Sequence, residues 1–352
     1  MPFVRKVLLL ALAAVVCLPA ADPDLLKLAM PDAAVLAGIR LDQIRSSPLG
    51  RTMLSQIDTQ ESEFRKAVAM LGFNPLTDLN EILIAGPATM GAQQVLVLVR
   101  GVFDPARLPV LAQMGGGEVS TFQGVQIATV KQPQQTISAA CLDRATLILG
   151  DPKSVRGAIG RRSGGLRVSA KLASRADALS KLYDIWLVSL VPPGMMAKNV
   201  PDPKLGGLLK GDALQSIQEA SGGVRLGRDI QFALELVTRS EKDASSLADV
   251  FKFLMGLAVT QGKPEQAKLL ENLQFNVEGT RVRFGLTISE QEIARMIEAQ
   301  KQAAVAAAAR KKARAKPGSS EPVVVGSTPQ ETGITIYSSP KDMGVVKLPP
   351  PK

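Results

Sequence analysis

Residues 273–288 read Leu-Gln-Phe-Asn-Val-Glu-Gly-Thr-Arg-Val-Arg-Phe-Gly-Leu-Thr-Ile, and no other stretch of the chain indicates the fold class as clearly. Apolar and polar side chains alternate up to Val277, a turn follows at residues 278–281, and the alternation resumes from Val282. Such alternation places one face of a strand against a core and the other toward water, as in antiparallel sheets. The stretch therefore predicts a β-hairpin.

Signals that start and stop helices lie around this hairpin and along the rest of the chain. Ser289-Glu290-Gln291-Glu292 is a capping box, and Ser240 begins an amphipathic pattern of the same kind. Pro48 suits the first turn of a helix, and the apolar spacing that follows predicts one helix up to Leu71, closed by Gly72. Helices and strands thus alternate along most of the chain.

These elements predict an α+β fold with antiparallel β-sheets covered by helices, a long C-terminal helix and a disordered tail. It is open whether the body is two similar subdomains, because the strand over residues 33–41 resembles that over 185–191 only loosely. The predicted divisions are a signal peptide over 1–21, α+β subdomains over 22–162 and 166–300, a basic Ala-rich helix end over 301–316, and a disordered Pro/Ser-rich tail over 317–352.

The N-terminus has the three parts of an export signal. Arg5 and Lys6 precede an unbroken apolar run over residues 7–16, and small residues follow at Ala20 and Ala21. As a helix, a run of about ten residues covers about 15 Å, half of the roughly 30 Å hydrocarbon core of a bilayer. We therefore expect cleavage near Ala20/Ala21 and a periplasmic or extracellular location.

A lipid anchor at Cys17 is the competing interpretation. A lipoprotein signal usually has Leu three residues before the cysteine and Gly or Ala directly before it, whereas this chain has Ala14 and Val16. The sequence therefore favours cleavage over lipidation.

Several chemistries are excluded by composition. The chain contains no histidine, which removes Ser-His-Asp and Cys-His catalysis and zinc sites built on imidazole. After loss of Cys17 only Cys141 remains, so no internal disulfide is possible, and its apolar surroundings predict a core residue. We predict no catalytic residues, no cofactor and no metal site.

The net charge of +10 is unevenly distributed. Residues 301–352 carry nine Lys/Arg against three Asp/Glu, which leaves the body near neutrality. Nucleic-acid binding is therefore not expected.

The cations of the tail gather at Arg310, Lys311, Lys312, Arg314 and Lys316. They are either a solvated helix end, where cations suit the helix dipole, or a peripheral contact with an anionic membrane or polymer. The Ala-rich face beside them lacks the Leu, Phe or Trp side chains that insert into a bilayer, which favours the first interpretation.

The first 160 residues resemble a family of uncharacterised exported bacterial proteins, in which an opening strand and helix lead to a Gly-Phe-Asp-Pro-like turn. The matching segments are Met30-Pro31-Asp32-Ala33, Ala37-Gly38-Ile39, Ser47-Pro48-Leu49-Gly50, Gly72-Phe73-Asn74-Pro75 and Asp78-Leu79-Asn80-Glu81. Asn74 stands where the family has Asp. The resemblance implies bacterial export and brings no activity or site residue.

Together these features predict an exported, non-enzymatic binding or structural protein of the bacterial cell envelope, whose partner is an unknown protein or envelope polymer. The alternative is a carboxylate-dependent hydrolase or isomerase acting outside the cytoplasm. A deep cleft with two carboxylates within about 10 Å of each other would favour the enzyme.

Overall fold

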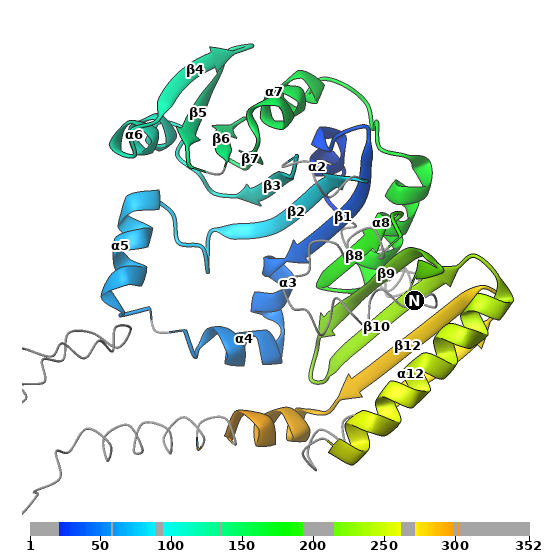
Figure 1. The fold of residues 1–352 in the computed structure, drawn as a ribbon. Helices are drawn as coiled ribbons and strands as arrows, with labels where there is room; N and C mark the ends of the chain where they lie inside the picture. The colour runs from blue at the N-terminus through cyan, green and yellow to red at the C-terminus, as the bar shows by residue number, and fades with distance from the viewer. Residues whose placement is uncertain are drawn as a thin grey trace, which may run out of the picture. The chain divides into compact units, whose positions relative to one another are not determined.

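A computed structural model describes residues 21–57, 59–88, 94–133, 135–192, 215–261, 272–298 and 302 (Figure 1). The chain divides into one unit that ends at Met296 and a second over residues 297–352. Only three residues of the second unit are described, so the fold below is that of the first. The predicted tail over 317–352 and all five cations of the basic segment lie outside the described residues.

Strands of the first unit form one twelve-stranded antiparallel sheet in the order β11-β12-β10-β9-β8-β1-β2-β3-β7-β6-β5-β4 (Figure 1). Their bounds are β1 Ala33–Arg40, β2 Leu79–Pro87, β3 Leu96–Gly101, β4 Glu118–Phe122, β5 Val125–Lys131, β6 Thr136–Cys141, β7 Thr146–Gly150, β8 Ile185–Ser189, β9 Ile217–Leu226, β10 Ile230–Thr238, β11 Leu273–Glu278 and β12 Arg281–Ile288. The predicted α+β class with antiparallel sheet is confirmed.

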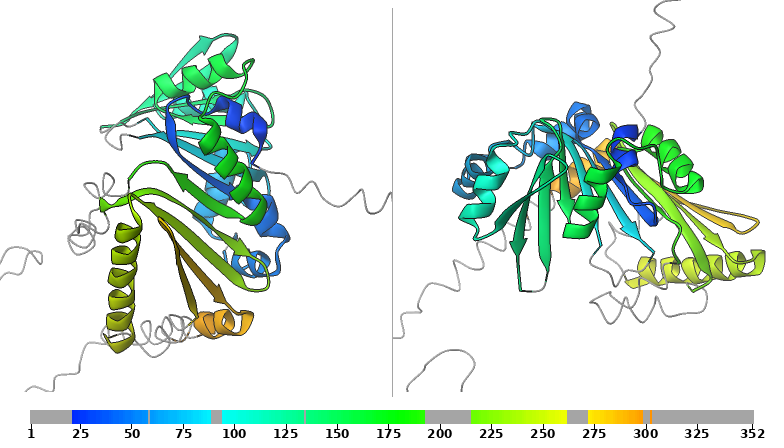
Figure 2. Two further views of the ribbon diagram at one scale, coloured as in Figure 1. Left: turned by 90° about the vertical axis from the view of Figure 1, so that its right-hand side faces the viewer. Right: turned by 90° about the horizontal axis from the view of Figure 1, so that it is seen from above.

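Helices lie against both faces of the sheet (Figure 2). They are α2 Pro23–Leu28, α3 Leu41–Ser46, α4 Pro48–Leu54, α5 Ser62–Leu71, α6 Arg107–Met114, α7 Pro152–Arg161, α8 Ala170–Leu182 and α12 Glu241–Gln261; residues 290–298 are also helical. Arg175 of α8 contacts Glu235 of β10, whereas α12 packs in one apolar cluster with the next residue, Leu236. Adjacent strand residues point to opposite faces, so α8 and α12 cover opposite faces, which we call the α8 face and the α12 face.

The predicted hairpin is confirmed as β11 and β12, whose register pairs Phe275 with Phe284. Both helix starts beside it are confirmed as well. The Ser240 hydroxyl accepts the Asp243 N–H at 3.1 Å, and the Glu292 carboxylate accepts the Ser289 N–H at 2.9 Å. Each bond satisfies a backbone or side-chain group at a helix end that would otherwise lack a partner.

The single helix predicted from Pro48 to Leu71 is wrong, because the structure has two helices, α4 and α5. The segment between them is rich in polar residues. Its apolar side chain Ile57 is 42% exposed, and Met53 on the preceding turn is 49% exposed. An apolar stripe without a core to cover does not stabilise a continuous helix, since most helix stability comes from packing.

One sheet runs through both predicted subdomains. Its centre is the antiparallel pair β1–β8, in which Val35 lies opposite Ser189 and Ile39 opposite Ile185. On each side of this pair a hairpin follows in the sheet, β2–β3 or β9–β10, and the last strand of a later hairpin or meander pairs with it, β7 with β3 and β12 with β10. Helices α3, α4 and α5 separate β1 from β2, whereas most of the segment between β8 and β9 lies outside the described residues, so the similarity of the two predicted subdomains stays a prediction.

The core on the α8 face is built from apolar residues of the central strands and of helices α2, α7 and α8. Trp186 of β8 is 1% exposed and lies directly opposite Gly38 of β1. A Cβ atom at residue 38 would lie 2.3 Å from the Trp186 ring. Glycine in the middle of β1 therefore makes room for the largest buried side chain of the core.

Candidate functional site

A row of polar side chains crosses four neighbouring strands on the α8 face. The strand registers place Arg40 of β1 opposite Glu81 of β2, Glu81 opposite Arg100 of β3, and Arg100 opposite Thr146 of β7. Two residues further along β2, β3 and β7, the same face has the buried core residues Leu83, Leu98 and Ile148. The polar row therefore marks one end of this core.

Three members of the row are almost inaccessible to solvent. Arg40 is 4% exposed, Glu81 8% and Thr146 3%. Buried polar groups need hydrogen-bond partners, and the Arg40 guanidinium donates to the Ser180 carbonyl at 3.4 Å and lies 3.5 Å from the Asp42 carboxylate. The row therefore belongs to the protein interior, where Arg40 has polar partners of its own.

The beginning of the described chain is attached to this row. The Asp22 carboxylate accepts a 2.7 Å hydrogen bond from Arg100 Nε, and the backbone N–H of Asp22 donates to Glu81 Oε1 at 3.2 Å. The same Asp22 side chain caps α2 by accepting the N–H groups of Asp24 and Leu25. One residue therefore connects α2 to two strands of the sheet.

Burial dominates the electrostatics of Glu81 and raises the pKa of its carboxyl to about 7. The hydrogen bond from Asp22 and the charge of Arg40 lower this pKa, whereas the charges of Asp22 and Asp42 raise it further. In these surroundings the nearby hydrogen bond and positive charge do not offset the cost of burying an ionised Glu81 carboxylate.

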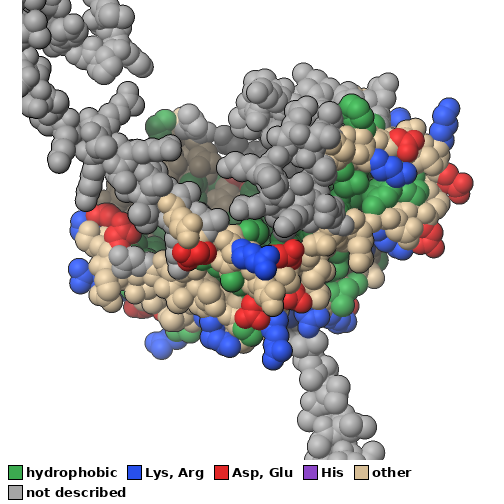
Figure 3. All heavy atoms as spheres, turned by 90° about the horizontal axis from the view of Figure 1, so that it is seen from below, with side chains coloured by type: hydrophobic (Ala, Val, Ile, Leu, Met, Phe, Trp, Pro, Cys, Tyr) green, Lys and Arg blue, Asp and Glu red, His purple; other side chains and the backbone are tan. Residues whose placement is uncertain are grey.

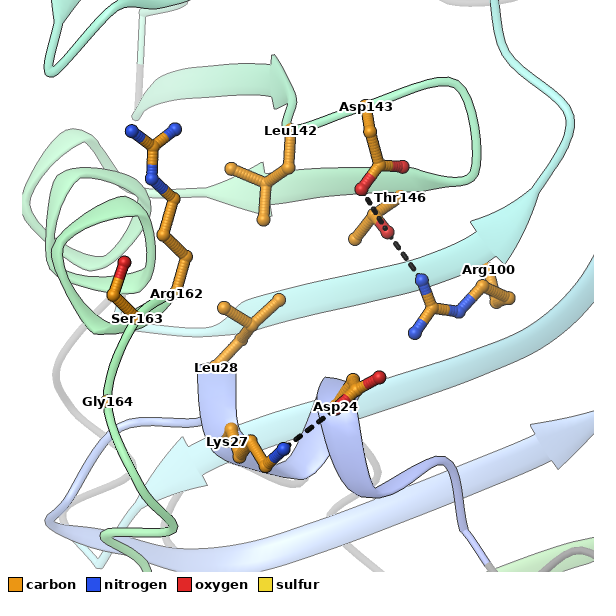
Figure 4. A pocket seen from close by; sticks show the side chains of 10 residues that line it. All are labelled: Asp24, Lys27, Leu28, Arg100, Leu142, Asp143, Thr146, Arg162, Ser163 and Gly164. Atoms are coloured by element: carbon orange, nitrogen blue, oxygen red, sulfur yellow. Dashed lines mark hydrogen bonds and ion pairs between the residues drawn. The ribbon is translucent and has the colours of Figure 1, made fainter.

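Next to the row lies a cavity of about 590 Å³ between α2, the end of α7, and the β6–β7 turn (Figure 4). Its lining combines three cations, two carboxylates and a few small or apolar side chains: Asp24, Lys27, Leu28, Arg100, Leu142, Asp143, Thr146, Arg162, Ser163 and Gly164. Arg100 and Thr146 belong to both the row and the cavity, because the Arg100 guanidinium donates to the Thr146 hydroxyl at 2.6 Å.

Both carboxylates of the cavity are already engaged. Asp24 forms a 2.9 Å ion pair with Lys27, and this hydrogen bond lowers the pKa of Asp24 below its ordinary value. Asp143 accepts the Ala145 N–H at 2.7 Å. The carboxyl whose pKa is raised, Glu81, is not among the lining residues. Two carboxylates thus line this cavity, and each already has a hydrogen-bond partner within the protein.

A second charged region lies on the α8 face over β9, β10, β12 and β11. Arg175 of α8 lies 3.4 Å from both Glu219 and Glu235, and Arg283 of β12 lies 2.9 Å from both Glu235 and Glu278. Although burial raises the pKa of Glu235, the Arg283 hydrogen bond and nearby arginine charges outweigh it and lower that pKa. We call this alternating set the charge ladder.

On the face that Figure 3 shows, several Lys and Arg side chains of the described residues lie beside Asp and Glu side chains. Within the described residues no cluster of three or more Cys, Asp and Glu could hold a metal ion, and no helix is long and apolar enough to cross a bilayer. Cys141 is half-buried among apolar residues. It packs against the edge of this apolar cluster, so its predicted place in the core is confirmed in part.

Sequence reasoning identified neither the row nor the cavity. The row's members are isolated polar residues in apolar strands, and only the strand registers bring them together. The one available signal was Arg40, Glu81 and Arg100, each a charge at the end of an apolar run. The predicted contact residues Arg310, Lys311, Lys312, Arg314 and Lys316 lie outside the described residues, so their role stays a prediction.

No protein-family model and no curated protein matches the sequence. Among solved structures, crystal form I of TP0453 is similar to this chain with a TM-score of 0.46 and 12% identity, covering 80% of this chain and 99% of the other. Crystal form IV of TP0453 has a TM-score of 0.47 and 12% identity, covering 78% and 96%. At this level the likeness transfers no residue, ligand or activity to this chain.

Proposed function

We propose that this chain is an exported, non-enzymatic binding protein of the bacterial cell envelope, and that the cavity beside α2 binds an acidic polymer of that envelope. Export is supported by the charged, apolar and small-residue segments before Asp22. The observation that carries binding is the cation set of the cavity: Lys27 and Arg100 pair with Asp24 and Asp22, whereas Arg162 donates to a backbone carbonyl and has no carboxylate partner among the described residues. Arginine and lysine donors of this kind suit carboxylate or phosphate groups.

Export is tested with a reporter. Residues 1–30 are fused to alkaline phosphatase, which is active only outside the cytoplasm, and activity is measured in a Gram-negative host. We expect activity from the native segment and none when Leu9→Arg interrupts the apolar run. Equal activity of the two fusions, or none in either, would contradict export through this segment.

Ligand binding is tested by calorimetry with an oligomer of galacturonic acid as probe and the uncharged galactose oligomer as control. Arg162→Gln should weaken probe binding about tenfold, because a hydrogen bond to a charged group contributes roughly 1.5–3 kcal/mol. Arg228→Gln provides the matched control, since Arg228 is exposed and lies outside the cavity. If Arg228→Gln weakens binding as much as Arg162→Gln, the cavity is not the site.

The basic segment would add a peripheral contact with an anionic membrane or polymer. Deletion of residues 301–352 removes it and leaves the first structural unit complete. If this contact exists, the shortened protein leaves the membrane-associated fraction at physiological salt, where surface charges still act over about 8 Å. Unchanged fractionation would show that Arg310–Lys316 is a solvated helix end.

A further inference from the structure

The first described residues of the chain are buried rather than exposed. Ala21 is 2% exposed, and its backbone N–H donates to the Ser180 hydroxyl of α8 at 2.7 Å. Ser180 is itself 1% exposed and donates onward to the Asp177 carbonyl at 3.0 Å. Ala21 is thus part of the folded body, although it is the last residue of the predicted signal peptide over 1–21.

An anion lies close to this buried nitrogen. Glu81 Oε1 is 3.2 Å from the nitrogen of Asp22, the next residue. Three backbone bonds separate the two nitrogens, so the nitrogen of Ala21 lies at most about 7.5 Å from Glu81 Oε1. A positive charge at Ala21 would therefore act on Glu81 across a short, poorly solvated distance, over which charges interact strongly.

Hydrolysis of the peptide bond before Ala21 would create that charge. Water adds across the Ala20–Ala21 bond, Ala20 leaves with a carboxylate, and the Ala21 nitrogen takes up protons to become an ammonium group. The ordinary pKa of an α-amino group is about 7.7–8.0; burial lowers this pKa and the nearby Glu81 carboxylate raises it, so the charge at neutral pH depends on Glu81. An ammonium has three N–H donors where the amide has one, so it keeps the bond to Ser180 and has donors to spare.

We propose that signal peptidase cleaves the Ala20–Ala21 bond, and that the new α-ammonium group of Ala21 stays docked against the Ser180 hydroxyl and opposite the Glu81 carboxylate. This proposal rests on the export part of the proposed function. It moves the boundary of the signal peptide from residue 21 to residue 20. Cleavage must precede folding, because the bond joins a residue that the folded protein buries.

The alternative cut, after Ala21, fits the structure less well. It would remove a buried methyl group, leave the Ser180 hydroxyl without its 2.7 Å partner, and expose the space that Ala21 fills. Small-to-empty changes in a core cost free energy because the surroundings relax only partly. The structure therefore favours cleavage after Ala20 over cleavage after Ala21, two sites between which the sequence does not distinguish.

Docking of the ammonium group would complete the polar row. In the unprocessed chain Glu81 faces Asp22, Arg40, Asp42 and Arg100, and burial raises the pKa of Glu81 to about 7. An added positive charge favours the ionised carboxylate. The processed chain should therefore be more stable than the precursor at neutral pH, which keeps the precursor easier to unfold for export.

The test has two parts. Mass spectrometry of the protein recovered outside the cytoplasm should give a chain that starts at Ala21. A start at Asp22 or beyond would overturn the docking proposal while leaving export intact. A protein that stays uncleaved in the cytoplasm would overturn the proposed function itself, and a lipid-modified Cys17 would overturn the cleavage site.

The second part compares purified chains that start at Ala21 with a free or an acetylated amino group. At pH 6.5 the folding equilibrium constant of the free form should be roughly tenfold larger, the effect expected of a hydrogen-bonded charge. At pH 9.5 the difference should shrink, because the free amino group loses its proton. In Glu81→Gln the difference should also shrink, and Ser180→Ala gives a second, independent check. Equal stability of the two forms at pH 6.5 would overturn the docking.

Discussion

Replacement of Gly38 by alanine should destabilise the protein through one defined contact. The added methyl carbon would lie 2.3 Å from Cε2 and Nε1 of Trp186 and 2.5 Å from Cζ2. The ring cannot move away freely, because it is 1% exposed and part of the core on the α8 face. Forcing an extra methyl group into a packed core costs about 1–3 kcal/mol. We expect the free energy of unfolding to fall by that amount.

Gly86→Ala is the matched control for this experiment. Gly86 lies on the neighbouring strand β2, and a Cβ atom there meets nothing within 4 Å. Alanine at such a position reduces the entropy of the unfolded chain, so stability should be unchanged or rise by up to about 1 kcal/mol.

Trp186 makes the assay direct, because it is the chain's single tryptophan. Urea unfolding followed by its fluorescence gives the unfolding midpoint, and the native emission reports whether the ring keeps its apolar surroundings. Gly38→Ala should lower the midpoint and shift the native emission to longer wavelength. The argument is refuted if Gly38→Ala and Gly86→Ala unfold at the same urea concentration.

Three further predictions concern titratable and charged groups. Since burial raises the pKa of Glu81 from 4.5 to about 7, the folded chain with an acetylated N-terminus holds this proton more tightly than the unfolded chain. Its free energy of unfolding should therefore fall by about 3 kcal/mol between pH 4.5 and pH 7, and Glu81→Gln should abolish that fall in urea titrations. Burial raises the pKa of Cys141 to about 11, so a thiol reagent at pH 8 should react slowly with the native protein and quickly in urea; fast native reaction would contradict the burial. Arg175→Met should lower the free energy of unfolding by about 2 kcal/mol, because Glu219 and Glu235 of the charge ladder lose the cation that they share. Lys181→Met, which breaks a half-exposed ion pair with Asp177, should lower it by less than about 0.5 kcal/mol. Equal losses of the two variants in chemical denaturation would contradict this ranking.

Local patterns predicted the elements whose signal lies within a few residues. The alternation in residues 273–288 and the caps at Ser240 and Ser289 depend on neighbours in sequence, and the structure confirms them. Strand β2 and helix α8 went unpredicted. Most residues of β2 are apolar or small on both faces, so no period of two is visible.

The polar row shows why a site of this kind escapes sequence reasoning. Arg40, Glu81 and Arg100 are each an ordinary charge at the end of an apolar run, and about twenty or more residues separate neighbours in the row. Only the registers between β1, β2 and β3 bring them together. Register depends on long-range packing, which single-sequence patterns do not encode.

The pairing of β1 with β8 determines when the centre of the sheet can form during folding. Val35 and Ser189 lie about 150 residues apart in the chain, and contacts this distant form slowly because a long loop must first close. A chain that crosses a membrane from its N-terminus delivers β1 well before β8. During that interval one edge of β1 presents unpaired N–H and C=O groups, which can accept a strand from another molecule. The middle of the sheet, which is its best protected part once folded, is therefore the part most exposed to aggregation until β8 is available to pair with β1.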